Sequence, residues 1–318
     1  MSLIEPKYPS SHPFVAILMA TYNGELYLSE QLQSMADQVM PNWALFVSDD
    51  GSADKTKDLL DKFASTYSDK TVHVLNGPRK GFAKNFLSLV CSPDIHADFF
   101  AYADQDDVWV SDKLVRAIEW LESVPMQTPA LYCSRTDYVD RDLQHIAFSP
   151  DYDREPNFSN ALVQNIASGN TMVFNQAARQ LLQEAGKDVD IPLHDWWTYM
   201  LVTGAGGIVY FDRSPTVLYR QHDGNLWGMN AGWRARLSRI KKLFEGRFQG
   251  WNERHVAALM AVSNCLTADA RQKLNFFAAC RSGSGLFQRL IYLKKSRVYR
   301  QTTLANIGLL TAVLFRKI

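Results

Sequence analysis

The first third of the chain alternates short apolar runs with longer amphipathic segments, and this alternation restricts the fold more than any other feature. Residues 14–20 (FVAILMA) are continuously apolar, as in a strand buried on both faces of a parallel sheet. Residues 28–39 then place apolar side chains three and four positions apart, which predicts one face of a helix. The pattern recurs up to residue 121. It predicts right-handed βαβ crossovers and an α/β fold with a mainly parallel sheet.

The pattern becomes less regular after residue 121. The other strands and helices of the repeat are predicted at residues 43–48, 54–63, 72–75, 82–90, 99–103 and 110–121, with Ser111 capping the last helix. Later strands with irregular connections are predicted at residues 130–139, 171–174 and 207–211. Past residue 232 only helical patterns continue. We therefore predict a mixed-sheet domain over residues 14–230, flanked by helices, and a helical region over residues 231–318.

Charge is divided between these two regions. Residues 231–318 carry 17 lysines and arginines against three acids, a net charge of +14, whereas the preceding part has a net charge of −13. Apolar clusters flanked by bases at residues 233–244 and 286–300 predict amphipathic helices that lie on an anionic membrane. The alternative is a helical unit that packs its apolar stripe on the first domain. No nucleic-acid recognition motif accompanies the basic charge, so no nucleic-acid partner is expected.

Three features bear on the compartment. The four cysteines are widely spaced and form neither a zinc motif nor a disulfide pattern. The first residues lack the basic segment and apolar run of a secretory signal. The most apolar stretch, residues 304–315, is interrupted and too short to span a bilayer. We expect a cytoplasmic protein, peripheral to the inner face of the cell membrane.

Polar residues follow three of the predicted strands. These turns are Thr21-Tyr22-Asn23, Asp49-Asp50-Gly51-Ser52 and Asp104-Gln105-Asp106-Asp107. Ligands of doubly wound sheets bind beyond the carboxyl ends of the strands, so the turns predict a nucleotide site. The acids could instead be turn formers or helix caps, but capping explains at most one of the three carboxylates in the last turn. Three neighbouring carboxylates repel one another, and a divalent cation shared with substrate phosphates relieves that repulsion.

In this order and at these separations, the three turns resemble those of family 2 glycosyltransferases, which have the Rossmann-like GT-A fold. The resemblance covers about residues 14–225, and the Asp104–Asp107 turn followed by Trp109 is similar to that of the rhamnosyltransferase subgroup. It implies inverting transfer of a sugar, L-rhamnose from dTDP-rhamnose, to an acceptor hydroxyl. The acceptor would be a glycan or a lipid-linked glycan in cell-surface polysaccharide synthesis.

The resemblance also implies residue roles. The nucleotide would be held by Thr21, Tyr22, Asn23, Asp50, Lys84 and Asp104, with Asp50 bonding the base and Asp104 near the ribose and the metal. Asp106 would ligate Mn²⁺ or Mg²⁺. Alternatively, the basic residues around Lys84 form a solvent-exposed turn that does not contact the nucleotide.

Direct displacement at a sugar carbon requires a base that takes the proton of the acceptor hydroxyl. The sequence His194-Asp195-Trp196-Trp197 opens a predicted helix where the resembled family has a Glu-Asp or Gly-Asp pair, which makes Asp195 the candidate base. Trp196 and Trp197 could form platforms for sugar rings. The alternative for Asp195 is an acid favoured by the helix dipole in the first turn.

A last polar segment contains Arg220 and His222. His222 could complete the metal site, or Arg220 and His222 could contact the diphosphate and sugar. A single histidine is more often a structural residue. The turn at residues 168–171 is a candidate for the acceptor side. The processive Gln-x-x-Arg-Trp motif of the family is absent here, which favours addition of a single sugar.

Two other functions compete with glycosyl transfer. A sugar nucleotidyltransferase would carry a glycine-rich basic loop directly after the first strand, where this chain has Thr21-Tyr22-Asn23. A non-catalytic nucleotide-sugar-binding module would not need Asp104, Asp106 and Asp195. Both alternatives are therefore less favoured by the sequence.

Overall fold

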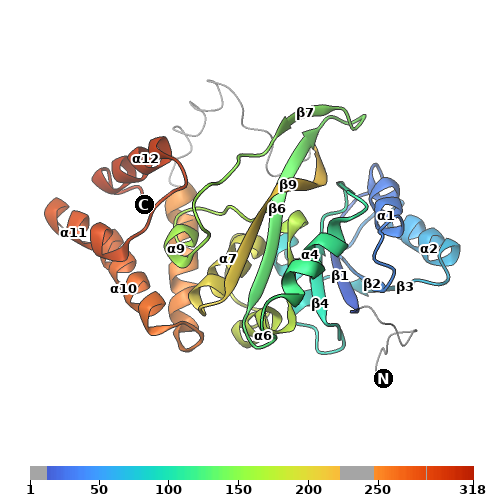
Figure 1. Ribbon diagram of the computed structural model, residues 1–318, viewed down its shortest axis with the longest axis horizontal. Coiled ribbons are helices and arrows are strands. Elements are labelled where there is room, and N and C mark those ends of the chain that lie inside the picture. The colour runs from blue at the N-terminus through green and yellow to red at the C-terminus, as the bar shows by residue number, and fades with distance from the viewer. Residues whose placement is uncertain (1–12, 223–246, 284) are drawn as a thin grey trace.

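The computed structural model describes residues 13–222, 247–283 and 285–318. Within them a nine-stranded sheet runs through the molecule, with helices on both of its faces (Figure 1). The strands are β1 Val15–Thr21, β2 Trp43–Asp49, β3 Thr71–Asn76, β4 Phe99–Ala103, β5 Val108–Trp109, β6 Ala130–Val139, β7 His145–Phe148, β8 Val173–Asn175 and β9 Ile208–Arg220. The helices are α1 Leu28–Ala36, α2 Thr56–Thr66, α3 Phe82–Val90, α4 Lys113–Glu122, α5 Phe158–Ala161, α6 Gln176–Ala185, α7 His194–Gly204, α9 Arg247–Ala261, α10 Ala268–Ser282, α11 Leu286–Ser296 and α12 Thr303–Leu314.

The sheet is mixed and mainly parallel in its N-terminal half, as predicted. Its order is β3-β2-β1-β4-β8-β6-β9-β5, with β7 beside β6. Strand β1 pairs in parallel with both β2 and β4, so that Ile17 lies opposite Leu45 on one side and Ala101 on the other. Strands β8 and β5 run antiparallel to their neighbours. Strand order reverses at β1 and β4, which is where an open α/β sheet forms its ligand crevice.

Two apolar cores lie on opposite faces of the sheet because successive strand residues point to opposite sides. Ala16 and Leu18 face the core that includes α3, α6 and α7, whereas Val15 and Ile17 face the core formed with α1, α2 and α4. The C-terminal helices supply side chains to the first of these cores, among them Leu259, Phe277 and Val313. The sheet and these helices therefore share one hydrophobic cluster. The boundary predicted near residue 230 lies outside the described residues, and the division into two domains stays a prediction.

Several local expectations require correction. The helix predicted from residue 110 begins at Lys113, and its N-cap is Asp112 without a side-chain cap, so the predicted Ser111 cap was wrong. The carbonyl of Ser111 instead accepts a hydrogen bond from the backbone N–H of Val39. The strand predicted at residues 171–174 starts later, because residues Gly169–Thr171 form a 3₁₀ turn. Strand β9 continues past residue 211, since its second half pairs with β5 and β6.

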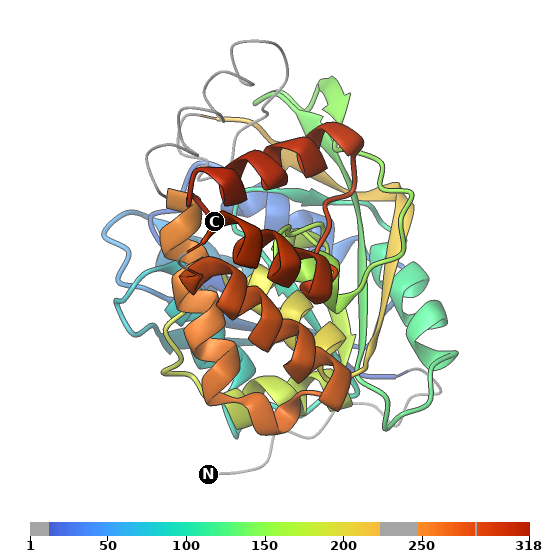
Figure 2. The ribbon, with the colours of Figure 1, turned by 90° about the vertical axis from the view of Figure 1, so that its left-hand side faces the viewer.

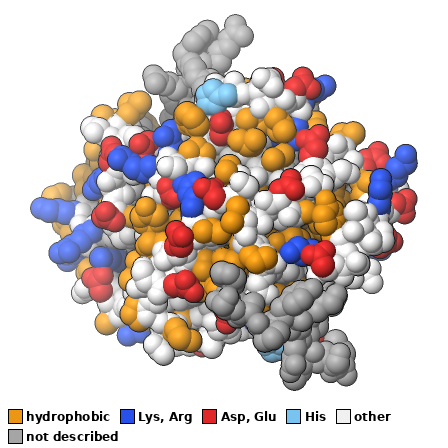
Figure 3. Space-filling view, turned by 45° about the vertical axis from the view of Figure 1, so that its right-hand side comes forward, with side chains coloured by type: hydrophobic (Ala, Val, Ile, Leu, Met, Phe, Trp, Pro, Cys, Tyr) orange, Lys and Arg blue, Asp and Glu red, His pale blue; other side chains and the backbone are white. Residues whose placement is uncertain are grey.

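The predicted helical character of the C-terminal region is confirmed for residues 247–283 and 285–318. Helices α10, α11 and α12 pack together at one end of the molecule (Figure 2). In the part of the chain that the structure describes, no helix is both long and apolar enough to cross a bilayer. The apolar cluster at residues 233–244 lies outside the described residues. The face drawn in Figure 3 carries interspersed acidic, basic and apolar side chains.

Candidate active site

The three polar turns that follow β1, β2 and β4 are joined by hydrogen bonds. The backbone N–H of Tyr22 donates to Oε1 of Gln105 at 2.9 Å, and Nε2 of Gln105 donates back to the carbonyl of Tyr22 at 3.0 Å. The backbone N–H of Asn23 donates to Oγ of Ser52 at 2.9 Å. Oγ1 of the buried Thr21 donates to Asp49 at 3.0 Å. The carboxyl ends of these strands therefore form one continuous polar rim.

Asp50 organises the loop that precedes α3. Its carboxylate accepts hydrogen bonds from the backbone N–H groups of Arg79 at 2.5 Å and Gly81 at 3.1 Å. Lys84, on α3, donates its ammonium group to the carbonyl of Val189 at 2.7 Å. This bond does not test the predicted contact of Lys84 with a nucleotide, which stays a prediction.

Asp104, Asp106 and Asp107 form a carboxylate cluster behind this rim. Burial, and then the carboxylate of Asp106, raises the pKa of Asp104 to about 7. Asp107 is fully buried, and burial together with its two acidic neighbours raises its pKa well above the usual range. Lys113 is also fully buried, and burial holds its pKa well below the usual range. Burial therefore disfavours the charged forms of Asp104, Asp107 and Lys113 in the absence of a ligand.

The turn at residues 168–171 connects this cluster to the start of α7. Nδ2 of Asn170 donates to Oδ2 of Asp107 at 2.6 Å, and the carbonyl of Asn170 accepts from Nζ of Lys113 at 2.5 Å. The preceding residue, Gly169, donates its backbone N–H to Oδ2 of Asp195 at 3.2 Å. Two consecutive residues thus hold the carboxylate cluster and the candidate base.

Asp195 lies in the first turn of α7. Its carboxylate also accepts hydrogen bonds from Nδ2 of Asn165 at 3.0 Å and from the backbone N–H of Trp196 at 2.6 Å. Burial outweighs these bonds and raises the pKa of Asp195 to about 6. The charge of Asp195 in turn contributes to the raised pKa of Asp104, so the two groups belong to one electrostatic site. A carboxylate with this pKa is ionised at neutral pH and more basic than an exposed aspartate, which suits a general base.

His194, whose role the sequence left open, is a structural residue here. Its ring stacks on Phe86 with the centroids 3.8 Å apart and meets Tyr102 edge-on. Burial lowers its pKa to about 3, so the imidazole is neutral. This packing fixes the first residue of α7 and, with it, the position of Asp195.

The two tryptophans after Asp195 are core residues. Trp197 is completely buried, and Trp196 is 4% exposed and packs against Phe248, Trp251 and His255. Neither indole offers a face to a sugar, and their expected role as platforms does not fit this packing. Helix α7 is continuously buried, so aromatic residues near its start serve the core.

Arg220 is also buried and lies at the end of β9. Its guanidinium group donates to the carbonyl of Asp106 at 3.3 Å and to Glu30, and it lies over the ring of Tyr27. The expected contact of Arg220 with sugar or acceptor is therefore not supported. Arg220 instead fixes the backbone of the carboxylate turn. Two residues later, Nε2 of His222 lies 2.9 Å from Oδ2 of Asp106.

Comparison with known proteins places this site in a family. The chain matches the model described as glycosyl transferase family 2 over residues 16–182. It is 31% identical over 236 residues to the dTDP-rhamnosyl transferase RfbG of Shigella flexneri, covering 70% of this chain and 78% of that protein. The chain belongs to glycosyl transferase family 2. It is also 34% identical over 110 residues to the glucosyltransferase WfgD of Escherichia coli, covering 34% of this chain and 40% of that protein.

The family 2 chain has the GT-A fold. The structure of TarS from S. aureus in complex with UDP-GlcNAc aligns with 89% of this chain and 90% of that chain, with a TM-score of 0.52 and 14% identity. At this identity the likeness concerns the fold alone. Family membership supports glycosyl transfer over sugar nucleotidyl transfer, as the turn after the first strand indicated.

A divalent cation fits the carboxylate cluster on chemical grounds. Among the described residues, Oδ1 of the buried Asp107 has no hydrogen-bond partner, and the pKa values of Asp104 and Asp107 are raised by burial and then by neighbouring negative charge. No three acidic, histidine or cysteine side chains within the described ranges converge as a complete metal site. A cation here would thus be held by Asp106 and His222 together with oxygens of the donor diphosphate, as is common for Mg²⁺.

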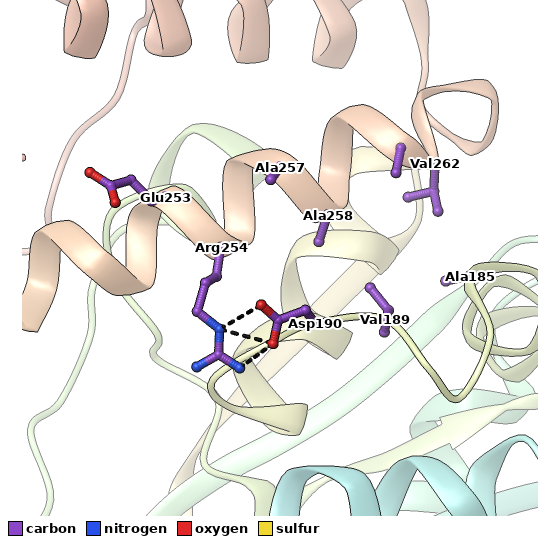
Figure 4. A pocket seen from close by; sticks show the side chains of 9 residues that line it. Ala185, Val189, Asp190, Glu253, Arg254, Ala257, Ala258 and Val262 are labelled. Carbon is purple, nitrogen blue, oxygen red and sulfur yellow. Dashed lines mark hydrogen bonds and ion pairs between the residues drawn. The ribbon is translucent and has the colours of Figure 1, made fainter.

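A separate pocket of about 530 Å³ lies between α9 and the loop before α7 (Figure 4). Alanine and valine side chains form much of its wall, and Arg254 closes one side with an ion pair to Asp190 at 2.6 Å. None of the residues of the candidate active site lines it. The ion pair instead ties α9 to the segment that leads into Asp195.

Sequence reasoning missed two contributors to this site, Asn165 and Lys113, and expected Asn170 only in a turn on the acceptor side. Asn165 and Asn170 hold the two carboxylates, and Lys113 is the buried lysine that bonds to the carbonyl of Asn170. The asparagines belong to polar loops with no distinctive pattern. Lys113 stands at the start of a helix, where a lysine is normally expected to reach water.

Proposed function

We propose that this family 2 protein is an inverting rhamnosyltransferase that moves L-rhamnose from dTDP-rhamnose to an acceptor hydroxyl in cell-surface polysaccharide synthesis. The choice of sugar and nucleotide rests on the likeness to the dTDP-rhamnosyl transferase RfbG. The observation that carries the reaction type is the turn at residues 168–171, which joins the carboxylate cluster to Asp195.

The reaction is a single displacement. The acceptor oxygen forms a bond to the anomeric carbon, the bond from that carbon to the diphosphate breaks, and Asp195 takes the hydroxyl proton. Because the oxygen attacks opposite the leaving diphosphate, the anomeric configuration inverts. Asn165, Gly169 and the N-terminus of α7 hold the carboxylate of Asp195 in one orientation, which reduces the entropy cost of the step.

The donor occupies the crevice beyond β1, β2 and β4. Tyr22 and Asn23 frame the base with Asp50, and Asp104 lies nearer the ribose, while the buried Thr21 supports the turn through its bond to Asp49. A bound Mn²⁺ or Mg²⁺ on Asp106 and His222 would supply positive charge against the leaving diphosphate. Asp107, Asn170 and Lys113 support this turn from behind and keep its carboxylates in place.

The acceptor is a glycan or a lipid-linked glycan. The name of the relative WfgD specifies a diphosphoundecaprenol acceptor, which supports a lipid-linked substrate for this chain too. A lipid-linked acceptor and the basic C-terminal region together favour a cytoplasmic enzyme attached to the inner face of the cell membrane, with an anionic lipid surface as a partner.

Product analysis with a panel of nucleotide sugars tests the proposal. The protein is incubated with Mn²⁺, a lipid-linked glycan and dTDP-, UDP- or GDP-sugars, and released nucleotides are separated by chromatography. We expect release of dTDP from dTDP-rhamnose together with a rhamnosylated product of inverted configuration. Release of pyrophosphate would instead indicate a nucleotidyltransferase, and binding of a nucleotide sugar without turnover would indicate a binding module.

A further inference from the structure

Helix α12 exposes an apolar face. Leu304, Ile307, Leu310 and Leu314 follow one another at spacings of three, three and four residues, and each is between 41% and 65% exposed. Residues Leu309, Ala312 and Val313 on the opposite side are buried. The helix contains no charged residue. Its buried side packs in the core, whereas these four outer side chains stay exposed.

Helix α11 continues this surface. Phe287, which is 78% exposed, and Ile291 lie one turn apart on its outer side, while Arg289 and Ser296 face inward. Lys294 and Lys295 are exposed at the end of the same helix. Figure 2 shows α11 and α12 side by side on the end of the molecule that faces the viewer there. We call the outer side of both helices, with Phe315 after α12, the α11–α12 face.

A contiguous apolar patch on the surface of a protein that does not span a membrane marks an interaction site. The charges around it favour an anionic partner, because Lys294, Lys295 and Arg297 are exposed at the end of α11 and residues 270–318 contain no acid. A second copy of the chain would oppose this basic surface with the same charges, which is unfavourable. Helix α12 has 12 residues and a length of about 18 Å, short of the roughly 30 Å of a bilayer core. It can lie on a membrane but cannot cross it.

We propose that the α11–α12 face docks on an anionic lipid bilayer, with the apolar side chains of α12 and Phe287 entering the interfacial layer and Lys294 and Lys295 meeting phosphate headgroups. The inference deepens the proposed attachment to the membrane and rests on it. It also revises which residues make the contact. Leu290 and Leu293 are half-buried against the core, and Arg289 is buried with its guanidinium group donating to the carbonyl of Val313.

This docking orients the active site. Helix α9 packs on Trp196 of α7 through Trp251 and His255, so the C-terminal helices and the helix that carries Asp195 adjoin. The donor side, with β1, β2 and β3, lies toward the other end of the molecule (Figure 1). A bilayer at the α11–α12 face therefore lies at the end of the molecule away from β1, β2 and β3, which suits a lipid-linked acceptor and a water-borne donor.

Vesicle sedimentation with the full-length chain tests the docking. The vesicles contain phosphatidylcholine alone or about equal parts of phosphatidylcholine and phosphatidylglycerol. One variant replaces two apolar residues (Ile307→Gln with Leu310→Gln), and another replaces two bases (Lys294→Gln with Lys295→Gln). Matched controls replace exposed residues elsewhere, Met126→Gln and Lys62→Gln. Point substitutions are preferred to truncation because α9, α10 and α12 contribute to the core.

We expect the wild-type chain and both controls to sediment with anionic vesicles and not with neutral ones. Each double variant should reduce the bound fraction roughly tenfold at low salt. Added salt should remove the difference between the lysine variant and wild type, since salt screens the headgroup attraction. Unfolding temperatures close to that of wild type establish that the variants fold.

Two results would overturn the docking. One is equal sedimentation of wild type and both double variants with anionic vesicles. The other is a wild-type dimer in sedimentation velocity that the Ile307 and Leu310 substitutions dissociate, which would make the face a contact between copies. Release of dTDP from dTDP-rhamnose, measured in detergent, reports separately on the proposed reaction, so loss of that activity alone leaves the docking result standing.

Discussion

The backbone N–H of Gly169 donates a hydrogen bond to Oδ2 of Asp195, and there is almost no free space between the two residues. A methyl group added at Gly169 would lie 2.9 Å from Nε2 of His194 and 3.2 Å from Cβ of Asp195. The His194 ring cannot move aside easily because it stacks on Phe86. A residue without a side chain is therefore needed beside the candidate base.

We predict that Gly169→Ala slows sugar transfer and leaves donor binding intact. The added methyl group displaces Asp195, and a misplacement of about 1 Å can reduce the rate roughly 100-fold. Gly250→Ala is the matched control, because a methyl group there meets nothing within 4 Å. Single-turnover rates and calorimetric affinity for dTDP measure the two effects. A normal rate in Gly169→Ala would show that the site tolerates movement of Asp195.

Asp195→Asn should reduce the transfer rate by about 10²–10⁴-fold, because the amide cannot take the acceptor proton. The affinity for dTDP and its dependence on Mn²⁺ should stay close to wild type, since Asp195 acts on the acceptor hydroxyl. If Asp195 is only an acid favoured by the start of α7, the same change should cost a fraction of a kcal/mol in stability and leave the rate unchanged. Single-turnover transfer with a competent acceptor decides between these outcomes.

The pH dependence of transfer should show an acid limb governed by Asp195. Burial raises its pKa to about 6, and only the ionised carboxylate accepts a proton. With donor and Mn²⁺ saturating, kcat should be constant above pH 7 and fall about tenfold per pH unit well below pH 6. Rates in overlapping buffers measure the limb. Its persistence in Asp195→Asn would assign it to another group.

Asp106→Asn should weaken the metal-dependent binding of dTDP at least about tenfold, which is the usual cost of losing a metal-ligand contact. His222→Ala should act in the same direction, because His222 lies beside the carboxylate of Asp106. Asp137→Asn is a control, since Asp137 pairs with His145 on β6 and β7. Calorimetry with and without EDTA is the measurement. If wild type and Asp106→Asn bind dTDP with equal affinity, both with and without EDTA, then no cation contributes to binding through Asp106.

Two buried histidines should each add an acid-sensitive contribution to the stability of the fold. His194 and His255 are 5% and 2% exposed, and burial lowers the pKa of each to about 3. Both are neutral in the folded chain, whereas an unfolded histidine protonates near pH 6.5. Their contribution to stability is therefore complete above pH 6.5 and is lost as the pH falls toward 3, by up to about 1.4 kcal/mol per pH unit for each histidine. Asp104, Asp107 and Asp195, whose pKa values are raised, contribute with the opposite sign in this range, so wild type is compared with His255→Leu by urea unfolding between pH 7.5 and 5. The stability difference between the two proteins should change by up to about 1.4 kcal/mol per pH unit below pH 6.5.

The sequence was most informative where one local pattern had one physical explanation. The buried run of β1 and the amphipathic residues of α1 predicted their elements, because period and burial agree there. The turns after β1, β2 and β4 could be predicted to meet, since parallel strands end at the same edge of a sheet. The sequence offered His222 only as one candidate to complete the metal site, and the structure places its Nε2 2.9 Å from Oδ2 of Asp106, although 116 residues separate them.

The sequence was least informative about side chains that can either bind a ligand or support the fold. Trp196 can stack on a sugar or fill a core, and only the position of α9 determines that it fills the core. Arg220 and Lys84 can meet a phosphate or a carbonyl, and both meet carbonyls here. Strand β5 has two residues, too few for a periodic signal. These features depend on distant segments, so local patterns do not reveal them.

Arg220 bonds to the carbonyl of Asp106 and to Glu30, residues that precede it by 114 and 190 positions. A growing polypeptide can complete the strands and turns of the donor side long before this arginine leaves the ribosome. The carboxylate turn then lacks its last support, and His222 is not yet present beside Asp106. Because β9 is synthesised late, the site is complete only after β9 has joined the sheet. A nascent chain can therefore form the crevice beyond β1, β2 and β4 before Arg220 and His222 are present.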